Sequence, residues 1–313
     1  MDNLEKFYKA CSGGDVGAVE KLIHKVDPSS GDNYALRYCA CNNGHLDIVK
    51  ILMRDPRVDP SALQDIGIGW AIEKDFDDIF YYLIEDKRVN KNNIFVYASE
   101  YNRLDILNYL FDRYPIDIPE CGSSALDVCM SSDKTASILK RLLELGCNPN
   151  YDDNSLLLTA CSVGNLEAVQ VILDYSEIDP SHPDNKPLTI SANNGYYDIV
   201  VRLLKDSRVD PSYNNQEALN KACKMGHTNI AMHFLDDDRI DVSMSNYLAI
   251  YNSFICESKN HDLFIQMLKH ERTDVMDILN VSGIYQGVQF SEAVNDVLFN
   301  IRQENIDYIF KQI

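Results

Sequence analysis

One polar residue, Asp or Asn, returns along this chain at nearly constant intervals, each time in a short turn that follows an apolar segment. The nine marker residues are Asp27, Asp59, Asn90, Asp117, Asn148, Asp179, Asp210, Asp241 and Asp274. Their spacings are 32, 31, 27, 31, 31, 31, 31 and 33 residues. A period of this length is typical of a repeat array, in which each unit buries its apolar face only against its neighbours. The number of repeats, rather than the length of 313 residues, therefore sets the size of the fold.

The interval that starts at Asp210 shows what one unit contains. Leu219, Ala222 and Cys223 are spaced so that they share one face of a short helix, and Gly226 ends that helix. A second apolar stripe then follows within residues 230–235. The pattern predicts a turn, a helix, a reversal and a second helix in each unit.

A residue in the left-handed conformation is expected at the end of each first helix. Glycine adopts this conformation without steric cost, and Asn and Asp tolerate it best among the other residues. The glycines at this point are Gly14, Gly44, Gly164, Gly195 and Gly226, and four other repeats carry Asp75, Asn102, Asp133 and Asn260 at or near it.

The turns are expected to have one length except in one repeat. In seven turns the first apolar anchor of the helix lies nine residues after the marker, at Leu36, Ile68, Leu126, Leu157, Leu188, Leu219 and Ile250. After Asn90 the anchor Phe95 comes after only five residues, so this turn has lost four. We expect a gap in the row of turns near Lys91 to Asn93, and loss of a tolerant turn tip is preferred over a designed notch.

These features together resemble the ankyrin repeat family. The residues that carry the resemblance are Gly44-His45-Leu46-Asp47-Ile48-Val49 and Gly226-His227-Thr228-Asn229-Ile230, with the glycine and the apolar residues at matching positions. The turn pattern D-P-S-x-x-x-N-x-A-L resembles the variant found in ankyrin proteins of large DNA viruses and protists. The resemblance implies an all-α solenoid of helix-turn-helix units with short finger loops and no sheet. We expect one array over residues 1–313, with about nine repeats over approximately 3–274, and a degenerate insertion and capping repeat in 275–313.

The charge balance restricts the class of partner. Acidic residues number 48 and basic residues 29, which gives a formal net charge of −19. Nucleic acids and anionic lipids are bound by clustered Lys and Arg, so neither is expected here. A protein partner with a basic surface fits this charge, although the charge could equally serve to keep the array dissolved. The first residues lack a leader pattern and no apolar run approaches 18 residues, so a cytoplasmic location is expected, that of the host cell if the protein is viral.

The sequence holds no pattern of residues that marks catalysis or metal binding. Of nine cysteines, Cys11, Cys161 and Cys223 occupy one slot of three repeats, which favours core packing in a reducing compartment over disulfides or zinc. His45 and His227 lie several repeats apart and cannot share a metal. We therefore expect no cofactor, no metal and no enzymatic activity; an enzyme within the 275–295 insertion is the least favoured alternative.

The function that this predicts is a protein-binding scaffold, monomeric and without enzymatic activity, which grips a partner with its concave helix face and finger tips. An adaptor that delivers a host protein to a ubiquitin ligase through the tail from Val275 to Ile313 is the alternative. Aromatic residues two positions after the anchors either pack between repeats, which is preferred, or contact the partner. The candidate binding residues are Tyr38, Asn42, Asn43, Trp70, Glu73, Lys74, Tyr97, Glu100, Tyr101, Tyr151, His182, Asn193, Asn194, Tyr213, Asn214, Lys224 and Met225.

Overall fold

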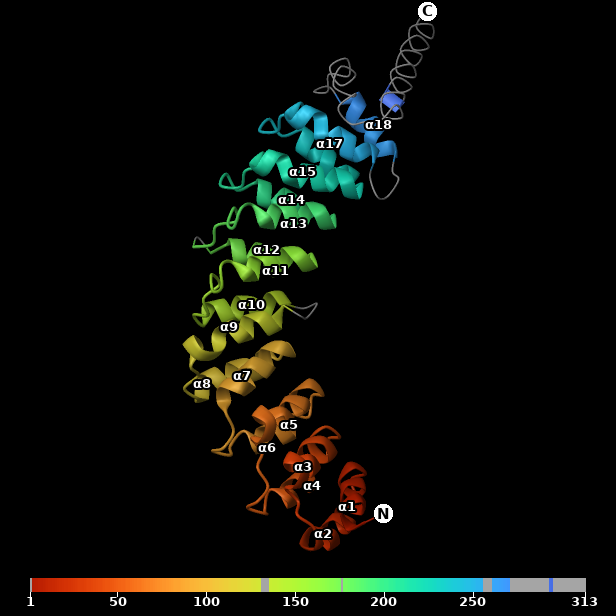
Figure 1. The fold of residues 1–313 in the computed structure, drawn as a ribbon. Helices are drawn as coiled ribbons and strands as arrows, with labels where there is room; N and C mark the ends of the chain where they lie inside the picture. Colours follow the sequence, from red (N-terminus) through yellow and green to blue (C-terminus); the bar gives the residue numbers. More distant parts are fainter. Residues whose placement is uncertain (1, 131–134, 176, 256–260, 271–292, 295–313) are drawn as a thin grey trace, which may run out of the picture. The chain divides into compact units, whose positions relative to one another are not determined.

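The structure is a computed structural model that describes residues 2–130, 135–175, 177–255, 261–270 and 293–294. Every regular element in this part of the chain is a helix (Figure 1), so the expected all-α fold is confirmed there. The chain divides into two compact units, Met1–Pro149 and Asn150–Ile313. The single array over residues 1–313 stays a prediction, and the insertion and capping repeat in 275–313 fall outside the described residues except for 293–294.

The first unit, Met1–Pro149, is a succession of helix pairs in chain order, coloured red to olive in Figure 1. Its elements are α1 (Asn3–Ser12), α2 (Val16–Leu22), the 3₁₀ helix η1 (Ile23–Lys25), α3 (Ser30–Tyr34), the π-helical η2 (Ala35–Cys41), α4 (Leu46–Leu52), α5 (Ala62–Glu73), α6 (Asp77–Leu83), α7 (Lys91–Glu100), α8 (Leu104–Arg113), α9 (Ile118–Cys129) and α10 (Thr135–Glu144). Each pair joins a first helix to a second helix through a tight reversal.

The second unit, Asn150–Ile313, repeats the same construction. Its elements are α11 (Ser155–Val163), α12 (Leu166–Leu173), α13 (Lys186–Asn194), α14 (Tyr197–Leu204), α15 (Tyr213–Met225), α16 (Thr228–Leu235), α17 (Met244–Phe254) and α18 (His261–Lys269). Figure 1 shows the loops that enter α13, α15 and α17 projecting from one end of these helices.

Burial follows the apolar stripes that the sequence predicts. First helices pack against the first helices of neighbouring repeats, as α5 does against η2 and α7, and as α13 does against α11 and α15. Second helices form a parallel layer, with α4 between α2 and α6 and with α14 between α12 and α16. Each repeat contributes fully buried side chains to this core, among them Phe7, Leu36, Ile68, Phe95 and Phe234. Because no helix pair could bury these groups alone, the neighbouring repeats stabilise one another.

The reversals adopt the predicted left-handed backbone. The five glycines at the ends of first helices have φ between +73° and +82°, and Asp75 and Asn102 take the same place with φ of +58° and +55°. Asp133 and Asn260 fall outside the described residues. The glycine signature therefore marks the helix ends correctly, both where glycine is present and where Asp or Asn replaces it.

A second reason for glycine at these points is a ring from the following repeat. A Cβ added at Gly44 would lie 2.8 Å from two atoms of the Phe76 ring, and one at Gly195 would lie 2.7 Å from the His227 ring. His227 Nε2 also donates a hydrogen bond of 2.9 Å to the carbonyl of Asn193. The residue after each reversal thus covers the helix end of the preceding repeat, and real Cβ atoms do not approach so closely.

Where the helix end is Asp75 instead of glycine, the covering residue is Arg103 instead of a ring. The Arg103 guanidinium lies 3.1 Å from Asp75, 2.6 Å from Asp77 and 2.8 Å from Asp105. A guanidinium can bond a carboxylate at its edge, so the side chain of Asp75 is accommodated. The two residue types at this contact therefore change together.

One expectation about the turns is wrong. The nine-residue spacing between Asp117 and Leu126 predicts a finger loop of ordinary length, but α9 begins at Ile118 and runs through this stretch. Asp117 caps the helix by accepting a hydrogen bond from the amide of Glu120, and Pro119 occupies the first turn, which favours helix initiation. The shortened turn after Asn90 is confirmed, because α7 begins at Lys91.

Candidate functional site

Five of the fingers begin with a turn in which a marker aspartate is followed two residues later by a serine. Asp59 Oδ1 accepts hydrogen bonds from the Ser61 amide at 3.0 Å and the Ser61 hydroxyl at 2.8 Å. The same pair of bonds joins Asp27, Asp179, Asp210 and Asp241 to the serine two residues later. The bond from the Ser29 hydroxyl lowers the pKa of Asp27, because it stabilises the ionised carboxylate. The marker residue therefore shapes the turn through its own side chain.

After this turn the fingers run through consecutive residues in the left-handed conformation. Leu63, Gln64 and Asp65 have φ of +52°, +59° and +63°, and Asn214, Asn215 and Gln216 have φ of +49°, +54° and +61°. Each such residue costs about 1–2 kcal/mol when it carries a Cβ. The repeat needs a compensating interaction at this place, and the last residue of each run provides it.

That last residue is polar, buried and bonded to the next turn. Asn33 Oδ1 accepts from the amide of Asp59 at 2.8 Å, 26 positions further along the chain. Asp65 and Asn185 likewise accept from the amides of Asn90 and Asp210. At the same position, Asn154 and Gln216 donate to the carbonyls of Asp179 and Asp241. All five are buried. A ladder of side-chain bonds thus joins each finger to its successor.

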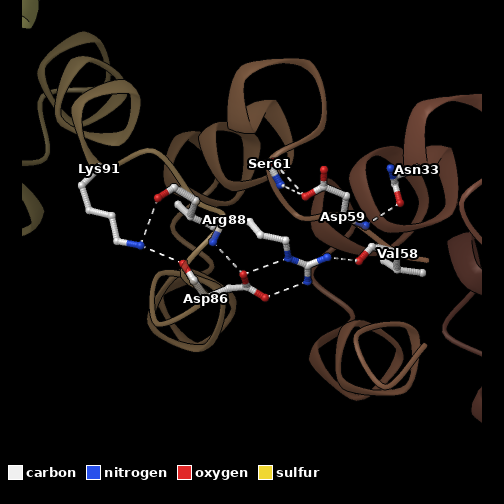
Figure 2. A network of polar contacts seen from close by, with 8 residues as sticks. Asn33, Val58, Asp59, Ser61, Asp86, Arg88 and Lys91 are labelled. Carbon is white, nitrogen blue, oxygen red and sulfur yellow. Dashed lines mark hydrogen bonds and ion pairs between the residues drawn. The ribbon is translucent and has the colours of Figure 1, made fainter. Parts of the chain in front are cut away.

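An Asp-x-Arg element joins two of the turns to the turns before them. Arg88 binds both oxygens of Asp86 at 3.0 and 2.8 Å, and its Nη1 donates to the carbonyl of Val58 at 2.8 Å (Figure 2). Arg239 repeats this arrangement with Asp237 and the carbonyl of Val209. The bond from the arginine lowers the pKa of the aspartate in each pair.

Two of the finger-tip candidates bridge neighbouring fingers. His182 Nε2 contacts Asp153 Oδ1, and Tyr213 Oη donates to Asp184 Oδ1 at 3.0 Å. The two pairs are equivalent in the repeat. The His or Tyr lies three residues after its own marker, and the Asp that it contacts lies five residues after the marker of the preceding repeat. Both tips remain exposed on their outer side, whereas Tyr151 is half-buried. Side-chain contacts between neighbouring fingers therefore hold these tips, so they are not independent loops.

None of the candidates at the reversals is fully buried. Asn43 turns its amide inward to the carbonyls of Tyr38 and Cys39, and Asn194 turns its amide to the carbonyl of Ser162. Glu73, Lys74 and Lys224 are exposed, and Asn42, Asn193, Glu100, Tyr101 and Met225 are half-buried. Asn43 and Asn194 thus serve partly to cap helices, and Glu73, Lys74 and Lys224 are the exposed charged members of this set. Asn214, at a finger, bonds Glu217 of its own helix at 2.7 Å.

The aromatic candidates form one continuous row in the first unit. Tyr34 and Tyr38 stack with ring centroids 5.2 Å apart and planes inclined by 14°, and Tyr38 meets Trp70 edge to face at 5.8 Å. Tyr8 extends the row, with its ring 4.9 Å from that of Tyr34. Tyr38 is 46% exposed, and Tyr8, Tyr34 and Trp70 are half-buried, so the row reaches the surface of the unit. Sequence reasoning missed Tyr8 and Tyr34, although the spacing of Tyr34 and Tyr38, four residues on one helix, is the signal that would have found them.

Beyond Trp70, on α5 and α7, carboxylates lie near the tyrosine rings. The Tyr97 ring lies against Gly69, and its hydroxyl donates to the carbonyl of Gln64 at 3.1 Å. Burial raises the pKa of Tyr101 to about 12, with the negative charges of Glu100 and Glu73 adding to the effect. Burial also raises the pKa of Glu100, and Glu73 raises it further. The rings and carboxylates of the two repeats therefore share one electrostatic environment.

The chemistry expected of the other singled-out residues can be compared with the structure. The eight cysteines of the described chain are buried, and burial raises the pKa of Cys41 and Cys161 to about 12, which makes them poor nucleophiles and metal ligands. Within the described ranges, no three His, Cys, Asp or Glu side chains lie close enough to hold a metal. None of the described helices has the length and apolar character needed to span a membrane.

A comparison with known protein families finds matches in both units. A model of three consecutive ankyrin repeats matches residues 95–184, 126–215 and 157–246, and a single ankyrin repeat matches residues 31–65. A search of curated proteins finds no match.

Proposed function

Because the chain belongs to the ankyrin repeat family, whose repeats are protein-interaction modules, we propose that it binds one partner protein through its first-helix face and finger edge. We define the first-helix face as the exposed sides of α1, η2, α5 and α7 in the first unit and of α11, α13 and α15 in the second. The observation that carries the proposal is the row of aromatic rings on this face, in which Tyr38 is exposed and the others are half-buried. Aromatic side chains dominate the energetics of protein interfaces, and their exposure on a folded surface is otherwise unfavourable.

The finger edge supports the same proposal. The ladder from Asn33 to its equivalents and the bridges at His182 and Tyr213 hold the turns in fixed positions before any partner binds. A preorganised edge loses less conformational entropy on association than free loops do. The scaffold acts without chemistry of its own, as a rigid surface for a partner whose surface is basic.

The charge supports the nature of the partner. The formal net charge is −19, and Glu73 and Glu100 stand on the first-helix face beside the rings. Complementary charge accelerates association and excludes acidic partners. Binding should therefore weaken as salt is raised, because exposed charges more than about 8–10 Å apart are screened at physiological ionic strength.

Cross-linking in cells that express the protein tests the proposal. An amine-reactive cross-linker followed by mass spectrometry should join one partner to Lys74 and Lys224, which lie at the reversals of first helices and are exposed. Lys140 and Lys205, exposed on second helices, are the matched controls and should be joined to the partner far less often. Cross-links spread evenly over the four lysines, or no partner at all, would refute the proposal.

A further inference from the structure

We propose that the aromatic row of Tyr8, Tyr34, Tyr38 and Trp70, with the adjoining Glu73 and Glu100, binds an extended segment of the partner protein that carries spaced arginine side chains. The inference rests on the proposed function and assigns to it one surface and one ligand chemistry. The occupant follows from the rings, from the carboxylates beside them and from the way the chain's own cations are distributed.

The geometry of the row leaves ring surface for a partner. Ring centroids follow one another at 4.9, 5.2 and 5.8 Å, and the near-parallel stacking of Tyr34 on Tyr38 covers one face of each ring. Tyr38 nevertheless keeps 46% of its surface exposed, and Trp70 is half-buried at the equivalent position of the next repeat. Alternate side chains of an extended peptide lie about 6.5–7 Å apart, which is about 1–2 Å more than the distance between neighbouring ring centroids, so a segment that follows the row need not place a side chain at every ring.

The carboxylates lie on the same side of the helices as the rings. Glu73 follows Trp70 by three residues and Glu100 follows Tyr97 by three, and residues with this spacing are neighbours on a helix surface. At the other end of the row, burial raises the pKa of Tyr8, and Cys39, Tyr34 and Asp27 add to the effect in that order. Lys74 is the cation next to this group, one position after Glu73.

Cations of the chain lie over the rings of tyrosines on or next to the second helices. Arg113 lies 4.7 Å from the centroid of Tyr109, and Lys91 and Lys50 lie 5.5 and 5.9 Å from those of Tyr114 and Tyr82. Among the described residues, no cation takes such a place over Tyr8, Tyr34, Tyr38 or Trp70. Cations of the chain thus cover tyrosines on or next to the second helices, whereas Arg37, the cation that acts on Tyr34, donates from its guanidinium to the carbonyls of Asp32 and Gly31.

Arginine fits this surface better than lysine. Its planar guanidinium is weakly hydrated, stacks on aromatic faces and forms two parallel bonds with a carboxylate. A ring flanked by a carboxylate three residues away offers both contacts to one arginine. An acidic segment would meet repulsion from Glu73 and Glu100, and a wholly apolar segment would leave both carboxylates without partners.

The sequence contains a single tryptophan, Trp70, which reports directly on the row. The full chain is titrated with a synthetic octapeptide of alternating arginine and glycine while Trp70 fluorescence is recorded. We expect a saturable change, at least tenfold weaker binding when citrulline replaces arginine, and a severalfold weaker response with lysine. The inference is overturned if the arginine peptide does not saturate below about 1 mM, or if citrulline or glutamate peptides bind equally well.

Variants locate the binding. Tyr38→Ala should weaken the arginine peptide about two- to fivefold, as expected for one exposed ring, and Tyr38→Phe, which keeps the ring, should remain within about twofold of the original chain. Glu73→Gln should weaken binding and reduce its dependence on salt. Tyr82→Ala, at a tyrosine of α6 that is 39% exposed, is the matched control and should change nothing. An equal loss for Tyr38→Ala and Tyr82→Ala would refute the location.

The two proposals can fail separately. If cross-linking captures a partner on the first-helix face but Tyr38→Ala and the arginine peptide do not affect its binding, the arginine assignment is wrong and the proposed function stands. If the peptide titrates as described and no partner is cross-linked, the proposed function is wrong and the surface assignment stands.

Discussion

Replacement of Gly44 by alanine should destabilise the first unit more than replacement of Gly146 by alanine. Both glycines have left-handed backbones, with φ of +76° and +93°, so both variants share a cost of about 1–2 kcal/mol for a Cβ in this conformation. At Gly44 the new Cβ would also lie 2.8 Å from the Phe76 ring, whereas a Cβ at Gly146 would meet no atom within 4 Å. Overpacking of this kind adds about 1–3 kcal/mol. We therefore expect Gly44→Ala to lower the free energy of unfolding by about 1–3 kcal/mol more than Gly146→Ala does.

Trp70 serves as the reporter because both glycines and the tryptophan lie in the same unit. Urea unfolding followed by Trp70 fluorescence should show a midpoint lowered by roughly 1–2 M for Gly44→Ala and by less than about 1 M for Gly146→Ala, for a slope of about 2 kcal/mol per M. Equal shifts would refute the role of the ring.

A double-mutant cycle then isolates the contact. Phe76→Ala removes the ring and has its own cost, but it should relieve the overlap that Gly44→Ala creates. The double variant should consequently be more stable than the sum of the single effects by about 1–3 kcal/mol. A coupling energy near zero would show that the backbone conformation alone explains the glycine.

Three further predictions concern the finger ladder. Arg88→Lys loses the bidentate bond to the neighbouring carboxylate and should lower the free energy of unfolding by about 1–2 kcal/mol in urea titrations. The control Lys87→Ala, at the exposed neighbouring residue, should change it by less than about 0.5 kcal/mol, and equal effects would contradict the ladder. Asn33→Ala removes the bond to the next turn and a residue suited to a left-handed backbone, and should cost about 2–3 kcal/mol by the same assay; a cost below that of Lys87→Ala would contradict it. The side-chain bond to an arginine is the main reason why the pKa of Asp55 is lowered to about 2, against about 3.9 in an unfolded chain. The contribution of Asp55 to stability is therefore present above about pH 4 and is lost as pH falls through about 2. The stability difference between the original chain and Asp55→Asn should shrink over this window, and a constant difference would refute the assignment.

The repeat and its helix ends were predictable because they depend on local rules. The spacing of markers, the apolar stripes and the glycines each reflect constraints within one unit, and the left-handed Asp75 shows that even the substitutions follow those rules. The finger after Asp117 was not predictable from spacing. A capping aspartate with proline in the first turn favours helix there, and only the residues within the loop distinguish the two outcomes.

The contacts between repeats were missed because they join residues 24–35 positions apart. Asn33 and its equivalents recur six residues after the markers, and Arg88 recurs two residues before the marker, so the signal is present in the sequence. Its meaning depends on which backbone groups of the next turn lie nearby, and that is set by stacking. The aromatic row was recognised in part, since Tyr38 and Trp70 were singled out from the sequence but Tyr8 and Tyr34 were not, and the role of these residues in binding stays a prediction.

The pairing of each helix end with the residue that covers it determines how such a chain can lengthen by tandem duplication. A unit that carries Gly195 and Tyr196 can follow a copy of itself, since the ring of one copy would meet the glycine of the other. A unit that carries Asp75 and Phe76 cannot, because its ring would meet a side chain in a left-handed backbone. Tandem duplication is thus compatible with this contact in a unit whose first helix ends in glycine, and incompatible with it in the unit that ends in Asp75.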